Sequence, residues 1–479
     1  MDSSTTLVIS FAVYSLGIIL FGLYSTKLKK RTSDDFVLAN RELGPWASSL
    51  SASASSESGW VMLGLVGEAY AFGLAAIWII PGIAAGYLFN WFVIAERMRS
   101  FTARSGAVTL TQFIAHRYDR NSIALKIIPV VIISLAMLGY VAAQMNAAGK
   151  AFEATFDLDY TWGVLVGAAI ILTYTVSGGF RAICWTDIIQ AGFMVVALIG
   201  MPLIAFVKIG SLGAVTQSLQ TTDPGLMGWA AGKAGMAGLG FVIGLLGIGL
   251  GYPGMPHVLA RFMAAKDSKT VDKAAWISMA WFVLVYVGAV AFGLMARVLF
   301  GDLADPEQAL PIACNEFLPP VLAGFVIAAI VSAICSTADS QLLVVSSTIS
   351  RDVVPLFSSK SRDYLATVSW DRWTLVIIAI LSIAFALTKN RVIFEFVLYS
   401  WSVLGASFGP VVILGLLWRR TTKAGAISGM LTGLVVSVIW RNTPALKAVV
   451  YELVPAFLLA LAAVVIVSLL THASRASDA

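Results

Sequence analysis

The stretch 51–60 reads SASASSESGW, and it decides how the rest of the chain must fold. It lies inside an apolar segment, from 46 to about 70, that is long enough to cross a bilayer. Serines and a glycine are poor lipid-facing residues, and a carboxylate such as Glu57 at mid-membrane costs about 2.5 to 3.5 kcal/mol. Other parts of the protein must therefore surround this segment.

The composition is that of an all-α polytopic membrane protein. Hydrophobic residues make up 59% and charged residues 12% of the 479 residues, whereas charged residues reach about 25% in soluble domains. The apolar runs are continuous and about 17 to 25 residues long, which favours helices over a β-barrel. The first run lacks a preceding Lys or Arg and is too long for a signal peptide, so we expect it to remain as a helix.

Hydropathy predicts about thirteen transmembrane helices in a single transmembrane domain, 1–479. The predicted spans are 7–26, 46–72, 75–96, 124–149, 161–178, 184–207, 236–256, 274–299, 317–349, 373–388, 392–418, 424–440 and 445–471. They leave no room for a soluble domain, and they place the protein in the plasma (inner) membrane as a multi-pass protein.

The distribution of basic residues predicts the orientation. With the N-terminus outside and the C-terminus inside, most of the 32 Lys and Arg residues fall in cytoplasmic connections, as the positive-inside rule requires. The exceptions on the outer side are Lys150, Lys208, Lys233, Arg297, Lys389, Arg391, Arg441 and Lys447. The net charge of +6 therefore reflects the orientation of the protein in the membrane and does not indicate a nucleic-acid partner.

Two spans look interrupted, and they lie five spans apart. The first carries SASASSESGW, and the second reads GLGFVIGLLGIGLGYPGMPHVLARF, with repeated glycines, Pro253 and Pro256. Matched interrupted helices are typical of transporters built from two inverted five-helix repeats with a binding site at mid-membrane. We predict repeats at about 46–208 and 236–418, with extra helices at 7–26, 424–440 and 445–471.

Several polar residues could serve such a site. Carbonyls freed by a break, together with hydroxyls from another helix, suit a small cation. The span 317–349 supplies Ser336, Thr337 and Ser340 beside Asp339, and an acid inside a transmembrane run is functional by default. For Asp187, spacing alone leaves function and simple interfacial exposure equally open. No metal cluster, nucleophile-and-base set or phosphate-binding loop indicates an enzyme.

The chain resembles the sodium/solute symporter family, most closely its sodium/proline symporter branch. The resemblance rests on RELGPWASSLSASASSESGWVMLGL, GGFRAICWTDIIQA, GYPGMPHVLARFMAA, STADSQLLVVSS and FGPVVILGLLWRRTTKAGAISGM, which occur in the family's order. It implies a LeuT-like fold and sodium as the coupling ion.

The resemblance also implies site residues. Sodium is expected at the carbonyls of Ala54, Glu57 and Ala333 and the hydroxyls of Ser336 and Thr337, with Asp187 and Asp339 supporting or extending the site. Substrate is expected at the two breaks, and Arg41 matches a functional basic residue at the cytoplasmic start of the first broken helix. The residues expected to bind substrate are Ser58, Gly59, Trp60, Tyr140, Ile248, Tyr252 and Pro256.

Two departures from the proline branch affect these expectations. The branch carries Ala-Ser-Asp-Met-Ser-Gly-Trp where this chain has ASSESGW, so the acid has moved by one residue to Glu57, about 100° around a helix. Glu57 could reach the ion through the backbone, bind substrate or take a proton. The second departure is Ile248, which stands where the pocket usually has a tryptophan for stacking on the substrate.

The sequence thus predicts a sodium-coupled symporter that imports a small amino acid, with proline the first choice. The alternatives are proton coupling through Glu57, another small solute, or a transporter-like sensor; no signalling domain follows the last span to favour the sensor. The expected partners are the small solute, sodium and membrane lipid, without nucleic acid or an obligate protein partner.

Overall fold

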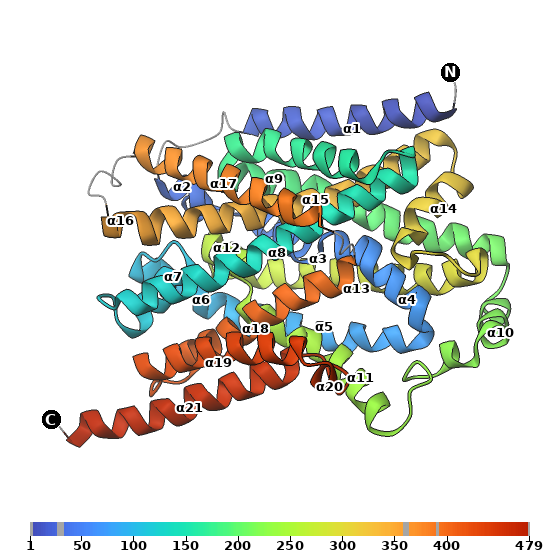
Figure 1. Ribbon diagram of the computed structural model, residues 1–479. Helices are drawn as coiled ribbons and strands as arrows, with labels where there is room; N and C mark the ends of the chain where they lie inside the picture. Colours follow the sequence, from blue (N-terminus) through green and yellow to red (C-terminus); the bar gives the residue numbers. More distant parts are fainter. Residues whose placement is uncertain (1–2, 26–32, 358–363, 389–391, 478–479) are drawn as a thin grey trace.

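The computed structural model describes residues 3–25, 33–357, 364–388 and 392–477 (Figure 1). The described residues are almost entirely helical, and the only β-type pairing among them is an isolated bridge between Leu43 and Ala265. The first half contains α1 (Ser3–Ser25), α2 (Ser33–Leu38), α3 (Pro45–Gly59), α4 (Val66–Phe72), α5 (Ile79–Phe89), α6 (Glu96–Ser105), α7 (Leu110–Tyr118), α8 (Ile123–Phe156) and α9 (Tyr160–Ile209).

The second half begins after α9. It contains α10 (Leu212–Thr222), α11 (Gly235–Gly247), α12 (Pro256–Ala264), α13 (Ser268–Phe300), α14 (Ala309–Phe317), α15 (Pro320–Thr348), α16 (Val354–Phe357), α17 (Tyr364–Ala386), α18 (Ile393–Leu417), α19 (Lys423–Asn442), α20 (Pro444–Lys447) and α21 (Leu453–Ser477). Three helical segments are wound more tightly or more widely than an α-helix and are used below. They are η2 (Ala39–Arg41), the π-helical η3 (Trp60–Leu65) and the 3-10 segment η7 (Ile248–Gly254).

The helices account for the predicted spans. Among the described residues, 11 helical runs are long and apolar enough to cross a membrane. One of them, Pro45–Ser105, contains two predicted spans, because the chain turns at Gly73 with φ 61°. The continuous helix α9 likewise contains two spans, separated by a kink at Gly179 with φ 67° and ψ −177°. Residue 26 at the end of the first predicted span, and Lys389 and Arg391, lie outside the described residues.

Several predicted boundaries are wrong by more than a few residues, and two of them are informative. The span expected at 373–388 begins earlier, at Tyr364. The extra helix expected at 445–471 begins later, at Leu453, because Pro444–Lys447 forms the separate short helix α20. Hydropathy could not separate the two, because the residues that join them, such as Val449 and Val450, are as apolar as the span itself.

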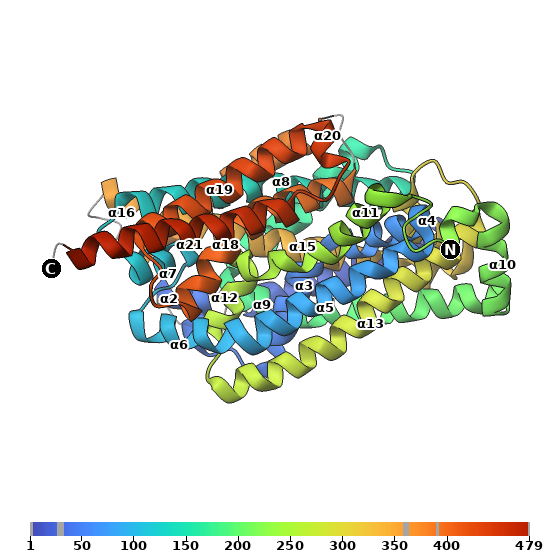
Figure 2. The ribbon, with the colours of Figure 1, turned by 90° about the horizontal axis from the view of Figure 1, so that it is seen from below.

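The two termini lie at opposite ends of the bundle (Figure 1), as an odd number of crossings requires. The end that carries α2, α6, α7, α16 and the C-terminus is the predicted cytoplasmic end, and α10 and α14 lie at the opposite, outer end. In Figure 2, α19 and α21 run side by side along one edge, next to α18, while α13 lies along the opposite edge.

Helix α15 forms the centre of the bundle. It contacts α1, α3, α8 and α9, and 83% of its membrane-length window is buried, compared with 28% for α1. Lipid-facing helices bury only one side, whereas a central helix must bury all sides. The hydroxyl-bearing and acidic residues of α15 are therefore enclosed by protein, as a membrane-embedded polar site requires.

Glycines allow the second break to pack tightly against α5. A Cβ atom on Gly249 would lie 1.9 Å from the carbonyl oxygen of Gly82, and one on Gly86 would lie 2.3 Å from the carbonyl oxygen of Gly249. Such distances are far below van der Waals contact, so no larger residue fits at these positions without moving the backbone. The glycines predicted to interrupt a helix also bring two helices together.

Candidate functional site

The structure places a break in both predicted helices. Ser58, at the end of α3, has φ 44° and ψ −173°, which interrupts the regular helix immediately before η3. The second break is η7, which ends in an extended residue, Met255, before Pro256 begins α12. Both Ser58 and Met255 are fully buried, so the irregular backbone faces protein and not lipid.

Four of the five residues predicted to bind sodium lie together. The Ser336 hydroxyl lies 3.0 Å from the carbonyl oxygen of Ala54 and 3.1 Å from that of Ala333. The Thr337 hydroxyl lies 3.4 Å from the same Ala54 oxygen. All four residues are fully buried. They form a group of hard oxygen ligands that joins α3 to α15, the ligand type that small cations prefer.

A buried arginine connects the two predicted acids. Arg261 in α12 lies 3.3 Å from the Asp187 carboxylate and donates to the Ser340 hydroxyl at 2.5 Å. Ser340 in turn lies 3.2 Å from the Asp339 carboxylate. The Ser51 hydroxyl donates to Asp187 at 2.5 Å and accepts from Arg261 at 2.9 Å. Residues from α3, α9, α12 and α15 therefore form one polar network.

The position of Asp187 excludes one of the two alternatives left open by the sequence. Its exposed fraction is 0%, so the expectation of simple interfacial exposure is wrong. One of its oxygens, Oδ1, has no hydrogen-bond partner among the described residues. With Asp339 and Arg261 also fully buried, the network holds two carboxylates and one guanidinium. With both carboxylates ionised, the network would carry one excess negative charge, which one monovalent cation would neutralise.

The Glu57 side chain is surrounded by hydroxyl groups. The Ser56 hydroxyl lies 2.9 Å from its carboxylate and the Tyr252 hydroxyl donates to it at 3.2 Å. The hydroxyls of Tyr87 and Tyr286 also donate to it. Glu57 is fully buried, and no Lys, Arg or His pairs with it among the described residues. Three tyrosines thus stabilise an acid without neutralising it.

This environment separates the Glu57 side chain from the predicted sodium ligands. Among the described residues, no hydrogen bond joins Glu57 to Ser336 or Thr337. The Glu57 carbonyl, expected to bind the ion, accepts from the amide of Trp60. The Glu57 carboxylate therefore belongs with Tyr252, a residue predicted to bind substrate.

The predicted substrate residues of the first break are fixed by local contacts. The amide of Gly59 donates to Gln144 at 3.1 Å, and the amide of Trp60 donates to the Ser58 hydroxyl at 3.1 Å. The Trp60 ring lies edge-on to Tyr286, with centroids 6.1 Å apart. The break therefore turns Trp60 towards the tyrosines that surround Glu57.

Tyr140 in α8 presents an unused polar group. It is fully buried, and its hydroxyl has no hydrogen-bond partner among the described residues. Its ring lies edge-on to His257, with centroids 6.2 Å apart. An unpartnered buried hydroxyl is costly, which makes this group available to a ligand.

An aromatic residue from another helix stands beside Ile248. Trp401 in α18 donates from Nε1 to the Ile248 carbonyl at 3.0 Å, and its ring lies 4.9 Å from that of Tyr252. A Cβ atom on Gly251 would lie 2.0 Å from Trp401 Nε1, so only glycine allows this approach. Trp401 therefore supplies an aromatic ring at the second break, where Ile248 cannot.

Two cavities show how the pocket is closed. Beside Tyr87 and Tyr252 lies a cavity of about 10 Å³, which has room for about one water molecule. A larger cavity of about 570 Å³ at the outer end reaches Ile248 and Phe394. The Phe394 ring lies 5.8 Å from that of Trp60. The outer cavity therefore ends beside the aromatic residues of the predicted pocket.

Pro256 does not join this group. It begins α12 and borders a separate cavity of about 20 Å³, shared with Phe180 and Val344. The structure therefore brings together most of the predicted substrate residues but not this one.

Arg41 joins the cytoplasmic end of the first broken helix to three other segments. Its guanidinium donates to the carbonyls of Met263 at 2.8 Å, Ala107 at 2.6 Å and Thr102 at 3.2 Å. Met263 belongs to α12 and Thr102 to α6, so one side chain connects both predicted repeats. The backbone of Arg41 has φ 58°, which continues a run of positive φ values that begins at Ala39.

Sequence reasoning missed four residues of this site. Arg261 lay within the quoted motif PHVLARFMA, and a basic residue so soon after a predicted helix break was a usable signal. The residues Tyr87, Tyr286 and Trp401 carried no such signal, because aromatic residues within apolar spans are ordinary core residues.

Comparisons with known proteins agree with this geometry. Residues 36–433 match the family described as Sodium:solute symporter family. The chain belongs to this family. The symporter is 36% identical to the high-affinity proline transporter PutP of Bacillus subtilis, over 93% of this chain and 94% of the relative. It is 35% identical to the sodium/proline symporter of Escherichia coli, over 100% of this chain and 95% of the relative.

A further relative and two solved structures extend the comparison. The osmoregulated proline transporter OpuE of Bacillus subtilis is 33% identical, over 98% of this chain and 95% of the relative. A sodium-coupled sialic acid symporter superimposes with a TM-score of 0.80 at 16% identity, covering 97% of each chain. The transporter Mhp1 superimposes with a TM-score of 0.58 at 16% identity, covering 89% of this symporter and 93% of that chain. The LeuT-like fold predicted for the symporter is confirmed.

Proposed function

We propose that this sodium-coupled symporter imports proline. The observation that carries the proposal is the similarity, along nearly the whole chain, to three relatives named for proline transport. The chemistry of the site supports it, because aromatic rings around one buried carboxylate suit a compact ammonium group on an apolar ring.

For sodium, the proposed ligands are the carbonyls of Ala54 and Ala333 and the hydroxyls of Ser336 and Thr337. The two hydroxyls already donate hydrogen bonds of 3.0 to 3.4 Å to these carbonyls. An ion could therefore take the place of the hydroxyl protons between the oxygens without large movement of the helices. With both Asp187 and Asp339 ionised, the nearby network of two carboxylates and one guanidinium would favour a monovalent cation. Asp187 and Asp339 thus support the ion from the same buried region.

For the substrate, we assign the ammonium group to Glu57. Its carboxylate is buried and unpaired by any basic residue among those described. A zwitterionic amino acid would bring a positive charge to it, while Trp60, Tyr252 and Trp401 would enclose the apolar ring. Of the three roles open to Glu57 from sequence, substrate binding best fits its contact with Tyr252.

Coupling would follow from which helices the two ligands join. Sodium would hold α3 to α15, and substrate would bind at the breaks in α3 and η7. The bundle could then rock and release both to the cytoplasm, where Arg41 closes the first broken helix against α12. One sodium ion crossing 100 mV supplies about 2.3 kcal/mol, which could sustain about fifty-fold accumulation.

The test is uptake of labelled proline by the purified protein in sealed vesicles. We expect uptake with an inward sodium gradient, further stimulation by a potential negative inside, and none with potassium or choline in place of sodium. Equal uptake driven by a pH gradient in sodium-free buffer would show proton coupling instead. Sodium-dependent uptake of another solute that proline does not inhibit would overturn the substrate assignment.

Changing Glu57→Gln should raise the proline concentration needed for half-maximal uptake by about thirty-fold or more. The reason is that losing one partner of a buried charge pair costs about 2 to 5 kcal/mol. Glu57→Asp should retain part of the affinity. Cyclopentanecarboxylate, which has the ring and carboxylate of proline but no amine, should compete poorly with proline in the unaltered protein.

The matched control is Glu316→Gln, which removes an exposed acid from α14. It should leave proline affinity unchanged. If Glu57→Gln also leaves it unchanged while transport stays coupled to sodium, Glu57 does not bind the amine.

A further inference from the structure

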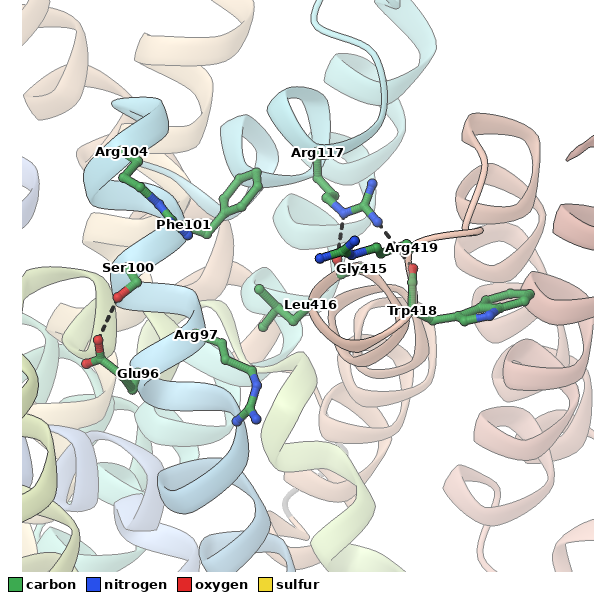
Figure 3. A pocket seen from close by; sticks show the side chains of 10 residues that line it. All are labelled: Glu96, Arg97, Ser100, Phe101, Arg104, Arg117, Gly415, Leu416, Trp418 and Arg419. Carbon is green, nitrogen blue, oxygen red and sulfur yellow. Dashed lines mark hydrogen bonds between the residues drawn. The ribbon is translucent and has the colours of Figure 1, made fainter. Parts of the chain in front are cut away.

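A further cavity lies at the predicted cytoplasmic end, away from the proposed transport site. Its volume is about 610 Å³, and it is lined by α6, α7 and the last residues of α18 with the turn that follows (Figure 3). These segments are far apart in the sequence. The positive-inside rule places basic residues at this end of the protein, but it does not require them to line one cavity.

Four arginines line the cavity: Arg97, Arg104, Arg117 and Arg419. The one acid in its wall, Glu96, is already occupied by Arg99 at 2.9 Å and by Ser100 at 2.6 Å. The cavity therefore has a strong excess of positive charge.

Two of these arginines are available to a ligand. Among the described residues, the guanidinium groups of Arg104 and Arg419 make no hydrogen bond and no ion pair, and both side chains are exposed. Arg97 donates only to the Val93 carbonyl of its own helix, at 2.7 Å. Several guanidinium groups therefore line one cavity without a carboxylate of the protein paired to them. Guanidinium groups bind phosphate oxygens in a bidentate manner, which makes a phosphate the fitting ligand.

Arg117 has a structural role, because its hydrogen bonds shape the wall of the cavity. It donates to the carbonyl of Gly415 at 2.6 Å and to that of Trp418 at 3.2 Å. The neighbouring Tyr118 hydroxyl donates to the Val411 carbonyl at 2.7 Å. These bonds hold α7 against the end of α18, so the wall between them is already formed before any ligand binds.

A smaller cavity of about 380 Å³ adjoins the first and shares Arg117 and Arg419 with it. It adds Lys423 and His472, and Lys423 is paired with Asp119 at 3.0 Å. The basic surface thus continues from α6 towards α21, along the side of the molecule on which α19 and α21 lie.

The apolar part of the wall points to a membrane ligand. Phe101, Leu416 and Trp418 line the cavity together with the arginines, and the adjacent Leu417, at the end of α18, is 45% exposed. Tryptophan is enriched at the level of lipid headgroups. A phosphate bound here would therefore lie beside a surface that faces acyl chains.

We propose that this cavity binds the phosphate headgroup of an anionic phospholipid from the cytoplasmic leaflet. The arginines bind the phosphodiester, Trp418 and Leu416 contact the glycerol region, and the acyl chains follow the apolar surface of α18. Basic pockets between transmembrane helices on this side of a membrane are suited to such headgroups. A bound lipid would connect α6 of the first predicted repeat with α18 of the second.

The test measures lipid retained by the purified protein after reconstitution into vesicles of equal parts phosphatidylglycerol and phosphatidylcholine. We expect the intact protein to retain phosphatidylglycerol selectively when it is extracted and analysed by native mass spectrometry. The double variant Arg104→Gln with Arg419→Gln should weaken this retention by about thirty-fold, since two basic contacts are lost.

The matched control is Arg420→Gln, which removes an exposed arginine from the same turn that does not line the cavity. It should retain phosphatidylglycerol like the intact protein. Sodium-dependent proline uptake in phosphatidylcholine vesicles shows that each variant is folded. Equal retention of both lipids, or full retention by the double variant, would overturn the proposal. Displacement of the lipid by inorganic phosphate would instead identify a site for the free anion.

Discussion

Alanine at both Ser336 and Thr337 is expected to abolish sodium-stimulated uptake, while the protein still reaches the membrane. Each hydroxyl lies within 3.4 Å of the Ala54 carbonyl, and together they are half of the proposed sodium ligands. Removing one buried polar partner costs about 1 to 3 kcal/mol, so losing two should raise the sodium concentration needed for uptake by about thirty-fold or more, which abolishes stimulation at the sodium concentrations that suffice for the unaltered protein. The measurement is proline uptake against sodium concentration at a fixed membrane potential.

The same helix offers a matched control. Ser346 and Ser347 are buried in α15, and each donates to a carbonyl of its own helix, Leu343 or Val344, at 3.0 Å. Changing both to alanine likewise removes two buried hydroxyls from the same helix, but neither of these hydroxyls donates to α3. Uptake by this control should keep its sodium dependence. If the Ser336 and Thr337 double variant does so too, sodium binds elsewhere.

Much of the fold could be predicted from the sequence, because bilayer thickness and basic-residue distribution constrain the helices strongly. The two breaks were predictable for a related reason. A run such as SASASSESGW is unsuitable for lipid, so it had to be buried, and Ser58 indeed leaves the helical conformation there. Boundaries were less certain where apolar loops adjoin spans, as before Leu453.

The partners of the buried acids could not be predicted, because they come from distant parts of the chain. Asp339 has no basic neighbour in sequence, yet Ser340 connects it with Arg261, 79 residues away from that serine. Glu57 was recognisable as a departure from the proline branch, but nothing local indicated that Tyr87 and Tyr286 would donate to it. The polarity of single residues indicates where a site lies, whereas the pairing of side chains within the site depends on how the helices pack.

Replacing Arg261 by glutamine is expected to lower the free energy of unfolding by about 3 to 5 kcal/mol, because it leaves buried carboxylates without their cation. Arg261 is fully buried and donates to Ser51, to the His257 carbonyl and to Ser340, besides pairing with Asp187. The variant would also have one more uncompensated negative charge. Sodium should therefore stabilise it more than it stabilises the unaltered protein, as measured by thermal unfolding in sodium chloride and in choline chloride.

Two comparisons separate this charge effect from general damage. Lys447→Gln removes an ammonium group paired with Glu395, where both side chains are exposed (42% and 50%), and should change stability by less than about 1 kcal/mol. Arg261→Gln combined with Asp187→Asn restores the original net charge and should recover part of the stability lost in the single variant. If the single variant unfolds like the unaltered protein in both salts, Arg261 does not compensate the acids. If it is destabilised equally in both salts, its role is packing, and the charge balance proposed to favour a monovalent cation does not hold.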